Sequence, residues 1–286
     1  MVRSCDVIRV RGERRGADVD RAATEEPLEI RLHGRPFAVV MRTPGADREL
    51  AAGFLLAEQV IGGSDDLGTI EYCTEKQPPR SPRTESREFS ALSASSAVPL
   101  ENVVNVTLTD PQRVERALAD RRQVTTSSSC GMCGRRTIES LTANVARVAS
   151  TWTISAPILV CLPERLRAAQ SVFDETGGLH AAGLFTPDGQ LVDHAEDVGR
   201  HNAVDKVVGR MLLRDALPLS QHLLCVSGRT SFEIVQKAVL AGMPIVAAVS
   251  APSSLAIDLA HESGVTLVGF VRGDSFNIYA HAERIT

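Results

Sequence analysis

The chain has 286 residues, 43% of them hydrophobic and 23% charged, with a formal net charge of -4 at pH 7. This ordinary globular composition does not indicate a nucleic-acid or polyanion binder. Because no apolar run reaches the roughly 18–20 residues that span a bilayer and the Arg-rich N-terminus lacks a secretory signal, we expect a cytoplasmic protein of two domains with reduced thiols.

The first part of the chain predicts a small α/β domain over residues 1–124. His33-Gly34 is typical of a hairpin turn, and Asp47 is a candidate N-cap for the helix that follows it. Residues 74–98 are rich in Pro, Ser, Thr and charge, which predicts a flexible insert. The expected elements are strands over 28–32 and 36–41, a helix over 47–61, a strand over 102–108 and a helix over 110–120.

Residues 125–150 hold the most informative motif, Cys130-Gly131-Met132-Cys133. Two thiols at this spacing bind half of a metal site, exchange electrons or carry sulfur as a persulfide. A helix is expected over 136–148, and its positive N-terminal end, together with Arg135 and Arg136, favours the thiolate form. The sequence has no second C-x-x-C, which argues against a structural zinc site with four cysteines. Cys161 and Cys225 lie in apolar runs and are expected to be buried.

Residues 151–286 alternate between helical and strand patterns. An antiparallel hairpin followed by alternating helices and strands predicts a mixed sheet covered by helices on both faces, with its last three strands parallel. The expected elements are helices over 163–174, 202–213, 231–240 and 253–261, and strands over 179–185, 190–193, 223–226, 244–249 and 265–271.

Three strand ends in this part carry small and polar residues, at 227–231, 250–254 and 270–275. Ligands of parallel sheets bind beyond the carboxyl ends of the strands, and the first two segments precede helices whose free N–H groups suit phosphate. Arg229 and Arg272 are candidate phosphate ligands, and Asp274 is a candidate acceptor for a guanine edge. The set favours a nucleotide or dinucleotide, although helix capping alone also explains such residues.

A polar cluster spans residues 196–206. His201 at the start of a helix is a candidate acid/base or ligand contact. The alternative is a capping network, in which Asn202 caps the helix while Asp205 and Lys206 face solvent.

At this point the chain resembles the formate dehydrogenase accessory sulfurtransferase family, FdhD/NarQ, from about Thr24 to Tyr279. The motifs that carry the resemblance are Glu26 to Ile30, Met41 to Gly45, Ser129 to Gly134, Thr176 to Ala182, Asp197 to Lys206, Ser227 to Glu233, Ser250 to Ala256 and Leu267 to Arg272. Two departures are a longer, more polar insert at 74–98 and the bulky Met132.

The resemblance implies a sulfur carrier that takes sulfur from a cysteine desulfurase and passes it to the molybdenum cofactor, in its bis-molybdopterin guanine dinucleotide form, before the cofactor enters formate dehydrogenase. It implies a cytidine-deaminase-like fold for residues 151–286, a homodimer, no permanently bound metal, and no membrane or nucleic-acid partner. Cys130 would carry the persulfide. Cys133 would stabilise the Cys130 thiolate, resolve the persulfide into a disulfide or carry sulfur itself. The family's cofactor-binding segment maps onto Phe270, Val271, Arg272, Gly273, Asp274 and Ser275.

Three other functions remain open. A zinc deaminase would use an H-x-E motif, present as His194-Ala195-Glu196, but this motif follows the cysteine pair and Ser129 replaces the usual proline. A thioredoxin-like dithiol oxidoreductase is compatible with C-x-x-C alone. A non-catalytic chaperone would bind the molybdenum cofactor without carrying sulfur.

Overall fold

The computed structural model describes residues 1–73, 100–121 and 147–286. The expected insert at 74–98, both cysteines of the C-x-x-C motif and most of the helix expected over 136–148 lie outside the described residues.

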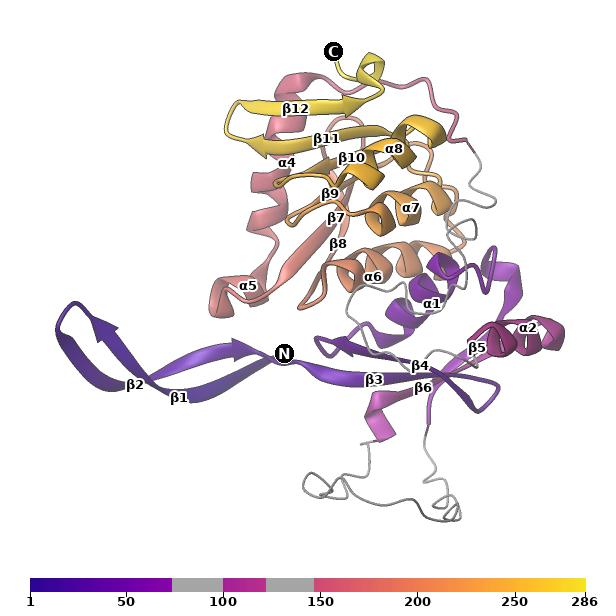
Figure 1. Cartoon of the computed structure of the whole chain (residues 1–286), viewed down its shortest axis with the longest axis horizontal. Coiled ribbons are helices and arrows are strands. Elements are labelled where there is room, and N and C mark those ends of the chain that lie inside the picture. The colour runs from indigo at the N-terminus through magenta and orange to yellow at the C-terminus, as the bar shows by residue number, and fades with distance from the viewer. Residues whose placement is uncertain (74–99, 122–146) are drawn as a thin grey trace.

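The larger sheet has six strands, in the spatial order β12-β11-β10-β9-β7-β8 (Figure 1). These are β7 His180–Phe185, β8 Leu191–Asp197, β9 Leu223–Val226, β10 Ile245–Ala248, β11 Thr266–Arg272 and β12 Ser275–Ala280. As predicted, β9, β10 and β11 are parallel. The hairpin of β7 and β8 pairs antiparallel with β9. The sequence did not predict β12, which returns antiparallel to β11 after a turn at Gly273, where φ is 57°.

Helices cover both faces of this sheet, which confirms the predicted α/β class (Figure 1). On one face lie α4 Ala156–Ala168 and α5 Ser171–Thr176, and on the other lie α6 Arg200–Leu213, α7 Phe232–Leu240 and α8 Ser254–Ser263. Each face has its own apolar core. The single helix expected over 163–174 was wrong, because α4 begins earlier, contains Pro163, and ends before Gln170 starts a separate short helix.

A second sheet, in the order β4-β3-β6-β5, holds the N-terminal part. Its strands are β3 Glu26–Leu32, β4 Arg35–Arg42, β5 Leu67–Tyr72 and β6 Val103–Leu108, accompanied by α1 Asp47–Ala57 and α2 Pro111–Arg121. The hairpin of β3 and β4, the strand β6 and both helices were predicted, whereas β5 was not. Short 3-10 turns occur at η1 Ser64–Asp66, η2 Leu100–Asn102 and η3 Ala282–Arg284.

A further hairpin precedes the second sheet and projects away from it (Figure 1). It consists of β1 Val2–Arg11 and β2 Arg14–Ala23, which pair only with each other among the described strands. Ile8, Val10 and Val19 are more than half exposed on it, at 56%, 63% and 59%. The sequence analysis did not predict this hairpin.

The helix α1 begins differently from the prediction. Its N-cap is Ala46, which has a φ of 54° and no side-chain cap. Asp47 is buried instead, and its Oδ2 lies 2.8 Å from Nη2 of the buried Arg42. The carboxylate that was expected to cap the helix therefore neutralises a buried guanidinium.

Helices α1 and α6 cross at two glycines and join the two sheets into one core. A Cβ on Gly53 would lie 2.0 Å from the carbonyl oxygen of Asp205, and one on Gly209 would lie 1.9 Å from that of Glu49. Both neighbours are backbone atoms of a packed helix, so neither can move without separating the helices.

We expect Gly53→Ala to lower the free energy of unfolding by about 2–3 kcal/mol, since overpacking outweighs the helix propensity gained by alanine. Urea unfolding measures the change. Gly63→Ala is the control, because no atom lies within 4 Å of its added Cβ. A Gly53→Ala protein as stable as the wild type would show that the two helices are not in close contact.

Candidate functional site

A cavity of about 930 Å³ opens at the carboxyl ends of the parallel strands, the edge where the sequence placed a ligand. Ser227 after β9, Val249 after β10, and Val271 and Arg272 at the end of β11 line one side of it. The opposite side comes from α4, α5 and the segment 177–180 that leads into β7. The cavity therefore lies on the α4–α5 face of the sheet.

Arg272 is the cationic residue at the strand-end side. Its Nε donates to the carbonyl oxygen of Val249, 2.9 Å away, and its guanidinium carbon lies 5.6 Å from the ring centroid of Phe270. Among the described residues its Nη groups have no hydrogen-bond partner. A fixed Nε with two open Nη groups suits bidentate binding of a phosphate.

His180 lines the cavity, although the sequence analysis assigned no role to it. Burial, followed by the nearby Arg200, His201 and Arg229, lowers the pKa of its imidazole below the ordinary value, so it is neutral at pH 7. An added Cβ on Gly228 would lie 3.1 Å from its Nδ1, so that glycine makes room for the ring. The available signal was the position of His180 two residues after Gly178, at the start of a strand.

His201 lies beside this edge but not among the cavity-lining residues. Its side chain is buried, and its Nε2 lies 2.9 Å from Oγ of Ser231 and 2.8 Å from Oε2 of Glu233. Burial alone would raise the pKa of Glu233, but the hydrogen bonds from His201 and Ser231 lower it overall. The three side chains form a polar contact that joins the starts of α6 and α7.

The other predicted cofactor residues lie outside the cavity lining. Arg229 is exposed after β9, and Phe270 is 37% exposed on β11. Gly273, Asp274 and Ser275 form the exposed turn into β12, where the hydroxyl of Ser275 donates to the carbonyl oxygen of Arg272. Within the predicted segment 270–275, Val271 and Arg272 line the cavity.

Comparison with known proteins places this fold in a family. The family model described as FdhD/NarQ matches residues 23–286. The chain belongs to the FdhD/NarQ family. The sulfur carrier protein FdhD of Streptomyces avermitilis is 50% identical, with 98% of this chain and 94% of that protein covered. The sulfur carrier protein FdhD of Mycobacterium tuberculosis is 48% identical, with 92% and 91% covered.

A solved structure shares the fold. The crystal structure of a formate dehydrogenase accessory protein from Desulfotalea psychrophila matches with a TM-score of 0.74 at 23% identity, covering 100% of this chain and 99% of that chain.

No helix in the described parts of this FdhD/NarQ chain has the length and apolarity needed to cross a membrane.

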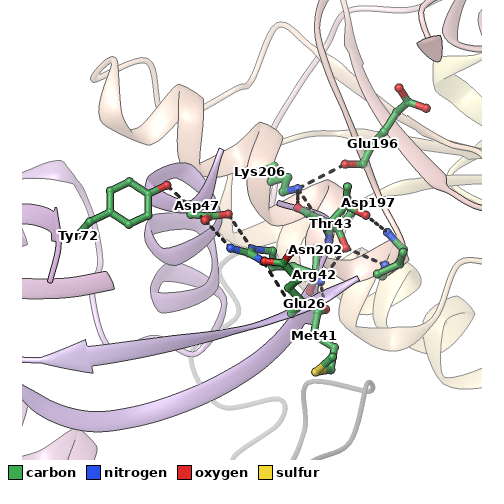
Figure 2. Close-up of polar contacts among 12 residues, drawn as sticks. Glu26, Met41, Arg42, Thr43, Asp47, Tyr72, Glu196, Asp197, Asn202 and Lys206 are labelled. Carbon is green, nitrogen blue, oxygen red and sulfur yellow. Dashed lines mark hydrogen bonds and ion pairs between the residues drawn. The ribbon is translucent and has the colours of Figure 1, made fainter. Parts of the chain in front are cut away.

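The polar cluster at 196–206 forms the joint between the two sheets (Figure 2). Asp197 is fully buried, and its Oδ2 lies 2.7 Å from Nζ of Lys206 and accepts from the backbone N–H of Thr43 at 3.1 Å. Lys206 also donates to the carbonyl oxygen of Thr43 at 2.8 Å. Asn202 donates to Asp197 and to the carbonyl oxygen of Met41.

These contacts show that the capping network considered for residues 196–206 was wrong. Asn202 does not cap α6, whose N-cap is Gly199 without a side-chain cap. Asp205 and Lys206 do not face solvent, since they are 2% and 3% exposed. Asp205 pairs with Lys237 on α7 at 2.5 Å. The cluster is therefore an interior network that fixes α6 against the N-terminal sheet and α7.

The carboxylate of the H-x-E motif has a structural partner. Both oxygens of Glu196 accept backbone N–H groups at the start of α5, from Val172 at 3.0 Å and Phe173 at 2.8 Å. Within the described ranges, no group of three or more His, Cys, Asp or Glu side chains could hold a metal ion.

The described cysteines differ in reactivity. Cys225 is buried as predicted, and burial raises the pKa of its thiol to about 12, so it does not form a thiolate at pH 7. The prediction that Cys161 is buried was wrong, because Cys161 is only partly buried and its thiol donates to the carbonyl oxygen of Pro157.

Proposed function

We propose that this chain is a sulfur carrier that takes sulfur from a cysteine desulfurase as a persulfide on Cys130 and delivers it to the molybdenum cofactor of formate dehydrogenase. The observation that carries the proposal is the 50% identity, over 98% of the chain, to a protein named sulfur carrier protein FdhD. The C-x-x-C motif supplies the thiol that such a carrier needs.

The transfer chemistry balances as two thiol–disulfide exchanges. The Cys130 thiolate attacks the outer sulfur of the desulfurase persulfide, a new S–S bond forms, and the desulfurase cysteine leaves as a thiolate. In one route for delivery, Cys133 attacks the inner sulfur of the Cys130 persulfide. Sulfide is then released toward molybdenum, and the Cys130–Cys133 disulfide that remains is reopened by a thiol reductant. In the other route Cys133 only stabilises the Cys130 thiolate, and a thiol reductant attacks the inner sulfur of the persulfide. Sulfide is then released, and a second thiol reduces the mixed disulfide that remains on Cys130.

The cavity supports the acceptor half of the proposal. The acceptor substrate, bis-molybdopterin guanine dinucleotide, carries phosphates and guanine bases. Arg272 and the hydroxyl of Ser227 on the strand-end side suit the phosphates, while the α4–α5 side offers an aromatic ring and carboxylates that suit a base. A volume of about 930 Å³ accommodates a nucleotide half of this substrate.

The proposal also covers the partner proteins, the oligomeric state and the cellular location of the chain. A cysteine desulfurase and formate dehydrogenase are the partner proteins, the chain acts as a homodimer, and the transfer occurs in the cytoplasm. Analytical ultracentrifugation of the purified chain tests the dimer. A molecular mass equal to that of one chain at micromolar concentration would contradict it.

We expect guanosine diphosphate, a stand-in for half of the dinucleotide, to bind the full chain, and Arg272→Ala to weaken this binding about 10–100-fold because a charged hydrogen-bond donor to phosphate is lost. Isothermal titration calorimetry measures the affinities. Arg116→Ala is the control, since Arg116 is 71% exposed on α2. Absence of binding heat with the wild type would remove the nucleotide site from the proposal.

A further inference from the structure

The hairpin of β1 and β2, which we call the arm, has one apolar face that is open to solvent. Ile8, Val10 and Val19 on this face are 56%, 63% and 59% exposed. The strand register defines the apolar face by the cross-strand pairs Asp6–Val19, Ile8–Ala17 and Val10–Arg15. An isolated two-stranded hairpin is at best marginally stable in water, so an arm of two ten-residue strands gains stability from a surface that covers this face.

The opposite face of the arm carries its own ion pairs. Nε of Arg9 lies 3.0 Å from Oδ2 of Asp18, and Nη2 of Arg9 lies 3.7 Å from Oδ1 of Asp20. Arg9 alternates with Ile8 and Val10 along β1, so these contacts agree with a side chain that points away from the apolar face. The arm therefore has one face with internal ion pairs and one face whose apolar side chains have no cover.

Two charged side chains flank the apolar residues of this face. Asp6 lies toward the base of the arm and Arg15 lies toward its tip, on either side of the central Ile8–Ala17 pair. Both are exposed, and neither makes an ion pair or a side-chain hydrogen bond within the described ranges. The apolar face therefore has opposite charges at its two ends.

Such a face is self-complementary about a two-fold axis. When two arms pack face to face and antiparallel, with the Ile8–Ala17 pair of each at the axis, the tip end of one arm lies over the base end of the other. Arg15 then meets Asp6 of the partner subunit, and the reciprocal pair forms on the other side of the axis. The apolar side chains between the two pairs are removed from water.

The charge of the whole chain favours the same partner. Residues 1–23 carry more arginines than carboxylates, whereas the chain has a formal net charge of -4 at pH 7. The remainder of a second copy is therefore negatively charged and attracts the arm.

We propose that the apolar face of the arm binds the same face of a second copy of this chain, with Arg15 paired to Asp6 of the partner subunit. The proposal rests on the homodimer of the proposed function and identifies its contact surface. Arg21 at the base of the arm has Nη1 2.5 Å from Oε2 of Glu175 on α5, and other residues of α5 line the cavity. The dimer contact is thus joined to a cavity wall in each subunit.

Sedimentation equilibrium of the full chain tests this contact by charge reversal. Arg15→Asp and Asp6→Arg should each weaken the dimer about 10-fold or more, because like charges then meet twice across the axis. An equimolar mixture of the two variants should form a dimer with about the wild-type affinity, since each reversed residue meets an opposite charge on the other copy. Rescue in the mixture requires that the two pairs join different copies.

Two variants complete the experiment. Arg14→Asp is the matched control, since it makes the same charge change at the next residue, which the register places beside Arg11 on the opposite face. Its dimer affinity should equal that of the wild type. Ile8→Asp should weaken the dimer about 10-fold or more, because its two copies meet at the axis. Circular dichroism shows whether each variant keeps the folded structure.

Three outcomes would overturn the proposal. A dimer that is insensitive to Arg15→Asp, Asp6→Arg and Ile8→Asp is held by another surface. A mixture of the two charge variants that stays as weak as each variant alone excludes the antiparallel pairing. A wild-type chain that sediments as a single chain contradicts the homodimer as well, while sulfur transfer to Cys130 is measured independently and would still stand.

Discussion

Cys130→Ala is expected to lower the maturation of formate dehydrogenase by on the order of 1,000-fold or more, because the variant has no atom on which to form the covalent intermediate. The measurement is formate dehydrogenase activity in cells that depend on this chain for maturation. The fold should be unaffected, and guanosine diphosphate should bind the variant with wild-type affinity, since the cavity residues are unchanged.

Two further variants identify the role of the second cysteine. Cys225→Ala is the control within the cysteines, since the thiol of Cys225 is buried and its pKa is raised to about 12. The Cys133→Ser variant should still accept one sulfur atom on Cys130. It should lose the ability to mature formate dehydrogenase repeatedly only if Cys133 resolves the persulfide. Full maturation by Cys130→Ala would instead favour a chaperone that presents the cofactor without carrying sulfur.

Lys206→Met is expected to lower the free energy of unfolding by about 3–5 kcal/mol, because it leaves the buried carboxylate of Asp197 without its cation. Asp197 is 0% exposed, and Lys206 supplies both its ion pair at 2.7 Å and the hydrogen bond to Thr43. The loss therefore affects the joint between the two sheets as well as α6. Urea unfolding followed by circular dichroism measures the change.

Asp197→Leu combined with Lys206→Met should recover part of this loss, since it removes the uncompensated charge. Arg116→Ala, which breaks an exposed pair with Asp110, should change stability by no more than about 0.5 kcal/mol. An unchanged midpoint for Lys206→Met would mean that the Asp197 carboxylate is not enclosed as the structure has it.

The sequence predicted best those elements whose apolar residues follow a single pattern along the whole element. The strand over 223–226 was predicted to the residue, because its fully buried run lies between clear turn signals. β12 and the hairpin of β1 and β2 were missed because their residues are mostly exposed, so no buried apolar run marks them as strands. The capping role expected for Asp47 was wrong because its partner, Arg42, is buried beside it by tertiary packing.

The candidate site was predictable on one side only. The rule that ligands bind beyond the carboxyl ends of parallel strands pointed to Val271 and Arg272, and both residues line the cavity. The opposite side, with Gln170 and His180, depends on the break between α4 and α5, and no local pattern indicated that these residues face the strand ends.

The most direct test of the central claim is mass spectrometry of the chain after incubation with a cysteine desulfurase and cysteine. The account predicts a gain of one sulfur atom, about 32 Da, on the peptide that contains Cys130, removed by a thiol reductant. It predicts no gain in Cys130→Ala. A chain that acquires no sulfur on this peptide, or acquires it equally when Cys130 is replaced, would contradict the role of Cys130 as the sulfur carrier.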